Sequence, residues 1–318
     1  EQGVTHCFME VSSHGVEQSR IEALQFAGAV FTNLSHDHLD YHKTFAAYRD
    51  AKKKFFDKLS ENAFAITNLD DKNGEFMLQN TKAIKRTYAL KKLADFKAKV
   101  LENNIEGLQL RINENEVWSK LIGSFNAYNL LAIYATASML NLDGIETLKH
   151  LSMLESVAGR FEYFITENKN TIIVDYAHTP DALQNVLETI GDIRTGNEKL
   201  ICVVGCGGDR DATKRPIMAD IATQHSDLTI LTSDNPRTED PYKILAEMEA
   251  GVPAERKAKQ MTNVDREQEI RTAIQFSESG DIILIAGKGH EKYQEINGVK
   301  TPFDDLEIAK KHTNQLNK

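Results

Sequence analysis

Cysteine is scarce in this sequence, with only Cys7, Cys202 and Cys206 among 318 residues. No two of them form a CxxC pair or have zinc-ligand spacing, which argues against a disulfide framework and against structural zinc. Long hydrophobic runs are also missing, because runs such as residues 282–286 fall far short of the ~20 apolar residues of a membrane helix. No signal peptide is visible at the start. These absences predict a cytoplasmic protein without a membrane segment.

Positive charge is likewise in deficit, with 38 Lys and Arg against 47 Asp and Glu and a net charge of −9. No basic cluster is interleaved with aromatic residues, so nucleic-acid binding is disfavoured. The short run Lys52-Lys53-Lys54 fits the solvated face of an amphipathic helix. With 41% apolar residues the chain has the composition of a globular protein, and its length predicts two domains.

Short β-rich runs alternate with helical periodicity along the chain, which predicts the α/β class. In the first half we expect strands at 5–11, 29–34 and 63–67, short antiparallel strands within 84–122, and helices at 17–26, 45–59 and 126–140. In the second half we expect a hairpin of 161–166 and 171–175, a helix at 180–190, and strands at 200–205, 228–233 and 281–286. The pattern restarts near residues 151–156, so we predict domains at 1–155 and 156–318. Because Glu1 directly precedes an expected core strand, we also expect residues upstream of it.

Three expected strands of the second half run directly into polar or glycine-rich loops. These loops are Gly205-Cys206-Gly207-Gly208, Asp234-Asn235-Pro236-Arg237 and Gly287-Lys288-Gly289-His290. Ligands of open parallel sheets bind at the carboxyl ends of the strands, so the three loops are candidates for one shared site. Taken alone, each loop is also an ordinary polar turn.

Two polar motifs follow expected strands of the first half. Glu10 ends the first expected strand, and Ser12-Ser13-His14-Gly15 after it offers hydroxyl and backbone donors to an anionic ligand, with a solvated glutamate and a polar turn as the alternative. Residues 33–42 contain three histidines and two aspartates, a composition that suits Mg²⁺. Helix caps and surface histidines explain the same residues equally well. The ammonium of Lys52 repels a metal, whereas a lysine carbamate would be an anionic ligand.

Further polar motifs open expected helices. Asn126 and Asn129 are three residues apart and share a helix face, and side-chain amides can pair with both edges of adenine. Asp175 begins the motif Asp-Tyr-Ala-His-Thr-Pro, and Arg210 lies in Gly-Gly-Asp-Arg-Asp. Ordinary capping and turn chemistry remains the alternative for each.

The order and spacing of these motifs resemble the Mur ligase family over the whole chain, and within it the members that add meso-diaminopimelate. The resemblance implies a partial central ATPase-type domain followed by a Rossmann-like C-terminal domain. It further implies ATP and Mg²⁺ as cofactors, UDP-N-acetylmuramoyl-L-alanyl-D-glutamate and meso-diaminopimelate as substrates, a monomer, and a place in peptidoglycan synthesis, cell shape and cell division.

The resemblance also implies roles for individual residues. Glu10 and His38 resemble the Mg²⁺ ligands, and Lys52 resembles the carbamylated lysine (N6-carboxylysine) of the family. The other implied residues are Ser12, Gln18 and Arg20 for the UDP-muramyl-dipeptide; Asn126, Asn129, Arg160 and Asp175 for ATP; and Arg210, Asp234, Asn235, Pro236, Arg237, Gly287 and Glu291 for diaminopimelate.

The family's phosphate-binding loop, G-x-x-G-K-[ST], does not occur in this sequence. Gly287-Lys288 is followed by Gly289 and lies in the other domain. Truncation upstream of Glu1 is the simplest explanation, and we therefore expect this chain to be inactive alone. A lysine-adding or other Mur-type ligase, or a non-catalytic binding module, are the alternatives.

In the implied reaction ATP phosphorylates the D-glutamyl carboxylate, and the amine of the incoming amino acid displaces phosphate from the acyl phosphate. Diaminopimelate has a second ammonium-carboxylate centre, whereas lysine has a distal ammonium but no distal carboxylate. Arg237, with Arg210, can fork onto the distal carboxylate, and Glu291 and Asp234 can hold the distal ammonium. His178 is a candidate base for the amine, with a capping or packing role as its alternative.

Overall fold

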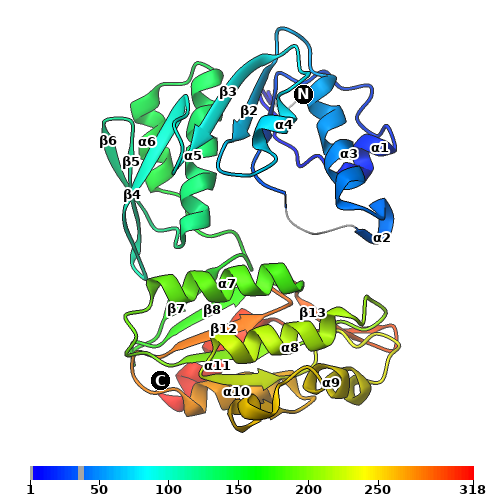
Figure 1. Cartoon of the computed structure of the whole chain (residues 1–318). Helices are drawn as coiled ribbons and strands as arrows, with labels where there is room; N and C mark the ends of the chain where they lie inside the picture. Colours follow the sequence, from blue (N-terminus) through cyan, green and yellow to red (C-terminus); the bar gives the residue numbers. More distant parts are fainter. Residues whose placement is uncertain (1–2, 35–38) are drawn as a thin grey trace. The chain divides into compact units, whose positions relative to one another are not determined.

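The structure is a computed structural model that describes residues 3–34 and 39–318. The chain folds into two compact units (Figure 1). The first unit consists of Glu1–Glu102, Gly107–Ser119 and Ser124–Leu154, and the second consists of Asn103–Glu106, Lys120–Gly123 and Glu155–Lys318. In the described part of the chain, no helix is both long and apolar enough to cross a membrane.

The first unit is built on a six-stranded sheet. Its strands follow chain order: β1 (Gly28–Phe31), β2 (Phe64–Asn68), β3 (Ile84–Ala89), β4 (Phe96–Asn104), β5 (Gly107–Ile112) and β6 (Asn115–Ser119). Strands β1 to β4 pair in parallel, and β5 and β6 form an antiparallel hairpin. The antiparallel arrangement expected for 84–122 is therefore correct for β5 and β6 but wrong for β3, which pairs in parallel with both neighbours.

Helices cover the parallel strands of this sheet. The helix α3 (Phe45–Asp57) is capped by the Thr44 side chain and packs Tyr48 and Phe56 against Phe31 and Ala65. The long helix α5 (Ser124–Met139) contacts β2, β3 and β5. The remaining helices of the unit are α1 (Ser13–Glu17), α2 (Leu39–His42), α4 (Gly74–Met77) and α6 (Gly144–Ser152).

Two expected elements near the start are wrong. Residues 5–11 form no strand, and their side chains, including Cys7, are largely exposed. A strand needs a hydrogen-bonded neighbour, and β1 is the edge of the sheet among the residues described. The helix expected at 17–26 begins earlier, because the Ser12 side chain caps α1 by accepting the N–H of Gly15. It ends before Ser19, which has a left-handed φ of 55°.

The second unit contains another six-stranded sheet. Its order is β11 (Gln260–Thr262), β10 (Leu228–Leu231), β9 (Leu200–Val204), β12 (Ile282–Ala286), β8 (Thr171–Asp175) and β7 (Glu162–Ile165). All neighbours are parallel except the edge pair β7 and β8, which is the expected hairpin. The α/β class predicted from the sequence is confirmed.

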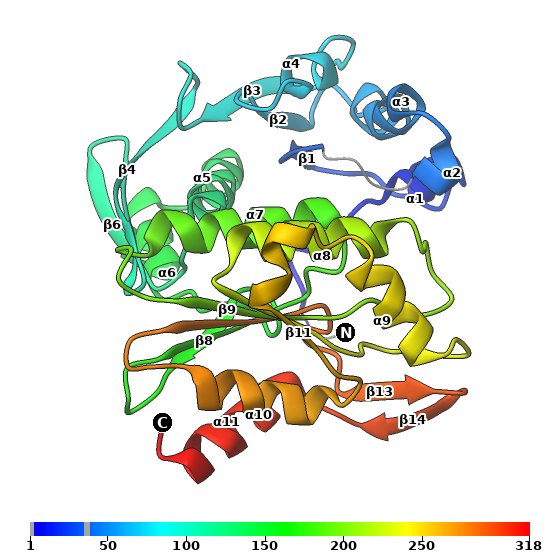
Figure 2. The same ribbon diagram turned by 60° about the horizontal axis from the view of Figure 1, so that its bottom comes forward.

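Helices flank both faces of this sheet (Figure 2). On one side lie α7 (Pro180–Ile193), α8 (Lys214–His225) and α9 (Pro241–Glu249), and on the other lie α10 (Arg266–Phe276) and α11 (Asp305–Leu316). Alternate residues of β9 enter opposite cores, with Cys202 on the first side and Val203 on the second. Burial on both faces explains why β9 and β12 are continuous apolar runs. A two-stranded hairpin of β13 (Tyr293–Ile296) and β14 (Val299–Pro302) follows β12.

Candidate functional site

The loops that follow β9, β10 and β12 meet at one edge of the second sheet. The three strands are parallel neighbours, so their carboxyl ends lie side by side. The backbone N–H of Gly208 donates to the carbonyl of Asn235 at 2.9 Å, which joins the first loop to the second. The N–H of Gly287 donates to the carbonyl of Asp175 at 3.0 Å, which joins the third loop to the end of β8. We refer to Asp234, Asn235, Arg237, Gly287 and Glu291 as the strand-end cluster.

The β13 strand holds the loop of Asn235 and Arg237 in place. The N–H of Arg237 donates to the carbonyl of Glu295 at 3.0 Å, and the N–H of Asn297 donates to the carbonyl of Arg237 at 2.6 Å. Arg237 has a φ of 51°, an uncommon conformation for a residue with a side chain. The hairpin therefore stabilises the turn that directs the Arg237 side chain.

Glycine is required where the loops approach most closely. Gly287 has a φ of +116°, and a Cβ there would lie 2.8 Å from Oδ2 of Asp234. A Cβ at Gly208 would overlap the carbonyl oxygen of Pro236. Both positions thus demand glycine for space, and Gly287 also demands it for its backbone conformation.

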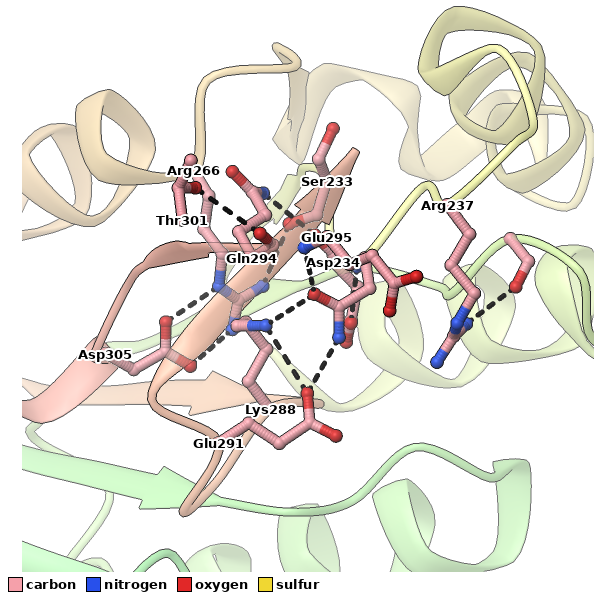
Figure 3. A network of polar contacts seen from close by, with 12 residues as sticks. Ser233, Asp234, Arg237, Arg266, Lys288, Glu291, Gln294, Glu295, Thr301 and Asp305 are labelled. Atoms are coloured by element: carbon pink, nitrogen blue, oxygen red, sulfur yellow. Dashed lines mark hydrogen bonds and ion pairs between the residues drawn. The ribbon is translucent and has the colours of Figure 1, made fainter. Parts of the chain in front are cut away.

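The strand-end cluster combines carboxylates with a guanidinium (Figure 3). Asp234 and Asn235 are buried, and Glu291 keeps 18% of its side chain exposed. Nη1 of Arg237 donates to the carbonyl of Gly208 at 2.6 Å, so one corner of the guanidinium is held by the neighbouring loop. Arg210 follows this loop and is exposed. An anionic and a cationic partner on adjacent loops suit a zwitterionic ligand.

Asp175 ends β8 and is nearly buried. Its Oδ2 accepts a hydrogen bond from the N–H of Phe161 at 2.7 Å. Burial raises the pKa of Asp175, against the opposing effect of the hydrogen bonds from Phe161 and Ala177 and of the Arg160 charge. The Arg160 guanidinium lies 4.9 Å from the centroid of the Tyr176 ring. Arg160 and Asp175 are therefore neighbours beside the strand-end cluster.

His178 bonds to its own turn. Its Nδ1 lies 2.8 Å from the carbonyl of Tyr176, so Nδ1–H donates to this carbonyl. The centroid of its ring lies 4.6 Å from the centroid of the Tyr176 ring. The centroid of the His290 ring lies 5.0 Å from the same Tyr176 centroid. His178 is exposed, and this hydrogen bond uses only its Nδ1.

In the first unit, Glu10 and Lys52 line the same cavity of about 710 Å³, together with β1 and residues 5–11. Lys52 is half-buried on α3, and its Nζ lies 5.4 Å from the centroid of the Tyr48 ring. His38 lies outside the described residues. Among residues 3–34 and 39–318, no three His, Cys, Asp or Glu side chains form a group that could hold a metal.

The residues expected to bind the UDP-muramyl-dipeptide gather around α1. Oγ of Ser12 accepts from the N–H of Gly15 at 3.1 Å and caps the helix. Nη2 of Arg20 donates to Oε1 of Gln18 at 2.5 Å in the turn that follows. The cap uses Ser12 Oγ as an acceptor, and its hydroxyl can still donate to a ligand.

Asn126 and Asn129 lie on one face of α5, as their spacing predicts. Nδ2 of Asn129 donates to Oδ1 of Asn126 at 3.1 Å. Between them, the hydroxyl of Tyr128 donates to Asp70 at 3.0 Å. Asp70 also accepts the backbone N–H groups of residues 90, 91 and 92, so it ties the start of α5 to the loop after β3.

Sequence patterns assigned no role to Lys288 within its candidate loop, and they did not identify Gln294. Lys288 is completely buried beside Asn235 and Glu291, and Nε2 of Gln294 donates to the carbonyl of Asp234 at 2.8 Å. A signal for Lys288 was present, because a lysine directly after a fully apolar strand must find buried partners. The hairpin that contains Gln294 has no strong alternation and was not predicted.

Comparisons with known proteins agree on one family. Residues 1–137 match the Mur ligase middle domain, and residues 159–289 match the Mur ligase, glutamate ligase domain. The chain is 57% identical over 316 residues to the UDP-N-acetylmuramoyl-L-alanyl-D-glutamate–2,6-diaminopimelate ligase of Cytophaga hutchinsonii, covering 99% of this chain and 65% of that protein. It is 53% identical to the protein of the same name from Bacteroides thetaiotaomicron, covering 98% of this chain and 64% of that protein.

Solved structures show the same relationship. A UDP-N-acetylmuramoyl-L-alanyl-D-glutamate–2,6-diaminopimelate ligase structure matches with a TM-score of 0.67 and 37% identity over 97% of this chain and 64% of that one. The MurF ligase of Thermotoga maritima in complex with ADP has the same fold, with a TM-score of 0.68 and 18% identity over 93% of this chain and 64% of that one. The chain thus spans 64–65% of the length of its similar relatives. With both characteristic domains matched in order, the chain belongs to the Mur ligase family.

Proposed function

We propose that the protein containing this chain ligates meso-diaminopimelate to UDP-N-acetylmuramoyl-L-alanyl-D-glutamate in an ATP-dependent step of peptidoglycan synthesis. The observation that carries this proposal is the strand-end cluster, where the loop of Asn235 and Arg237 is joined to the loop of Glu291 by the hydrogen bond from Asn235 to Glu291. The names of the similar relatives support the same reaction.

The strand-end cluster matches the distal centre of diaminopimelate in charge. Arg237, with Arg210, would fork onto the distal carboxylate, and Glu291 and Asp234 would hold the distal ammonium. Asn235, Pro236 and Gly287 would shape the wall between them. Lysine has the distal ammonium but no distal carboxylate, so it would leave Arg237 without its ligand.

The residues proposed for ATP and Mg²⁺ fit those groups in part. Glu10 and Lys52 line one cavity, which suits a cation held by a carboxylate and a lysine carbamate, with His38 as a further proposed ligand. Asn126 and Asn129 offer amide groups for adenine, and Arg160 and Asp175 are proposed to contact ATP. Bound Mg²⁺ would offset charge on the phosphate oxygens.

The proposed chemistry needs positioning more than acid-base assistance. The D-glutamyl carboxylate attacks the γ-phosphorus of ATP, which releases ADP and forms an acyl phosphate. The neutral amine of diaminopimelate then attacks the acyl carbon, and phosphate leaves as the amide forms. Ser12, Gln18 and Arg20 are proposed to hold the UDP-muramyl-dipeptide, and orientation of the reactants supplies much of the rate. We further propose a cytoplasmic monomer whose activity supports cell shape and division.

An amino-acid panel tests the proposal. The full-length protein, supplied with ATP, Mg²⁺ and the UDP-muramyl-dipeptide, should release phosphate with meso-diaminopimelate and at least tenfold more slowly with L-lysine at equal concentration. Phosphate release with lysine alone would identify a lysine-adding ligase. Release with neither amino acid, by a protein that still binds the UDP-muramyl-dipeptide in calorimetry, would favour a binding module.

Carbamylation of Lys52 has its own test. Protein equilibrated in CO₂-free buffer should lose activity by about fivefold and regain it with bicarbonate, because carbamate formation is reversible. Carbon-13 bicarbonate should give a carbamate resonance in the wild type that is absent from the Lys52→Met variant. Lys54→Met removes an exposed lysine of the same helix as Lys52, which pairs with Glu17 of α1, and it should keep the resonance. An identical carbon-13 spectrum in the Lys52→Met variant would disprove the carbamate.

A further inference from the structure

Lys288 is separated from the end of β12 only by Gly287, and it has no exposed surface. Lysine is almost never fully buried unless it is paired, because removing the ammonium from water is costly. Its Nζ lies 5.6 Å from the centroid of the Tyr293 ring and 5.9 Å from that of Phe303. Burial lowers the pKa of Lys288, against the opposing effect of nearby carboxylates.

The ammonium of Lys288 is bound to the amide and the carboxylate of the strand-end cluster (Figure 3). Nζ donates to Oδ1 of Asn235 at 3.0 Å and lies 3.4 Å from Oε2 of Glu291. Oδ1 of Asn235 also accepts from the N–H of Glu295 at 2.9 Å. Two donors on this oxygen determine which way the amide faces, so Nδ2 must point to Glu291, where it donates at 2.7 Å.

Glu291 is therefore held at one oxygen by two donors, Lys288 and Asn235. The Glu291 side chain stays 18% exposed, and both of these hydrogen bonds are on Oε2. The charged groups that act on Lys288 include Asp234, Glu291, Asp305 and Arg266. Because Asp305 is paired with Arg266, Asp234 and Glu291 are the carboxylates of this group that would attract an additional ammonium.

We propose that Lys288 is a positioning residue that sets specificity for the distal ammonium of the amino-acid substrate by orienting Asn235 and Glu291. The inference rests on the proposed function. Lys288 does not touch the reacting atoms. Without its ammonium, Oδ1 of Asn235 keeps only the N–H of Glu295 as a donor, and Oε2 of Glu291 keeps only the Asn235 amide, so both side chains are held less firmly toward an ammonium.

The test compares Lys288→Met with Lys292→Met in the full-length protein. Methionine keeps the length of the buried side chain and removes the charge. Lys292 lies on the same loop but is exposed and pairs with Asp304, so it is a matched control. In Lys288→Met, KM for meso-diaminopimelate should rise about tenfold while kcat and KM for ATP change less than about twofold. Lys292→Met should match the wild type.

A second substrate separates positioning from simple loss of structure. 2-Aminopimelate has both carboxylates of diaminopimelate but lacks the distal ammonium. The wild type should prefer diaminopimelate over 2-aminopimelate, and Lys288→Met should lose most of that preference. In an Asn235→Ala background, Lys288→Met should have a smaller effect than in the wild type, because part of the action of Lys288 passes through Asn235.

The outcomes distinguish the two proposals. If the wild type ignores diaminopimelate, the proposed function fails and the inference fails with it. If the wild type prefers diaminopimelate and Lys288→Met keeps the full preference over 2-aminopimelate, only the inference is overturned. Should Lys288→Met not fold, Asn235→Ala decides: unchanged preference in that variant overturns the inference, and lost preference supports it.

Discussion

Replacing Arg237 with alanine should raise KM for meso-diaminopimelate roughly 100-fold in the full-length protein. A guanidinium paired with a carboxylate in a desolvated site contributes about 3 kcal/mol, which corresponds to this factor. Arg237 is half-buried, and Nη1 is held by Gly208, so the rest of the guanidinium is pre-oriented for a ligand. Steady-state phosphate release with varied diaminopimelate measures the change.

Lysine as an alternative substrate separates the loss of carboxylate recognition from a general loosening of the loop. Lysine lacks the distal carboxylate, so Arg237→Ala should leave its kcat/KM within about threefold of the wild type. Arg256→Ala is a matched control, because this arginine pairs with Asp220 outside the strand-end cluster. Equal losses of kcat/KM for both amino acids would show that Arg237 acts on the loop through Gly208. An unchanged KM for diaminopimelate would show that Arg237 is not part of the binding site.

Replacing Arg266 with methionine should destabilise the second unit by about 3–5 kcal/mol. Arg266 and Asp305 are fully buried and form a two-bond pair, with Nε to Oδ1 at 2.8 Å and Nη2 to Oδ2 at 2.7 Å. The guanidinium also donates to the carbonyls of Ser233 and Ala286 at the ends of β10 and β12. Removing it leaves a buried carboxylate and two carbonyls without their donor.

Urea unfolding of the 318-residue chain, followed by far-UV circular dichroism, measures this loss. Trp118, the only tryptophan of the sequence, lies in β6 of the first unit, so its fluorescence reports on that unit. The double variant Arg266→Met, Asp305→Leu should recover most of the stability, because apolar residues often replace a buried ion pair without loss. A single variant as stable as the wild type would contradict the buried-pair argument.

The architecture of the second unit was largely readable from the sequence. The runs that became β9 and β12 are apolar at every position, and a parallel strand with helices on both faces needs that pattern. Because such strands point the same way, the polar loops after them were expected at one edge, and the structure places them there. Local pattern suffices when one physical rule, burial on both faces, governs every residue of an element.

The same kind of pattern failed for residues 5–11, whose apolar side chains are exposed and unpaired with any strand described. Propensity indicates that a segment suits a strand, but only a neighbouring strand supplies the hydrogen bonds. The helix expected at 17–26 failed for a local reason. The cap at Ser12 and the left-handed Ser19 moved both ends of the helix, and neither feature follows from hydrophobic periodicity.

The sequence by itself determined the α/β class and the residue types available at each strand end, and it predicted a two-part organisation. Only the tertiary structure decided how those residues act together. Asn235 and Lys288 are separated by 53 positions, yet one hydrogen bond between them determines the direction of the Asn235 amide and the partner of Glu291. Such contacts depend on distances of about 3 Å between loops from different strands, and no local pattern encodes a distance between segments so far apart in the chain.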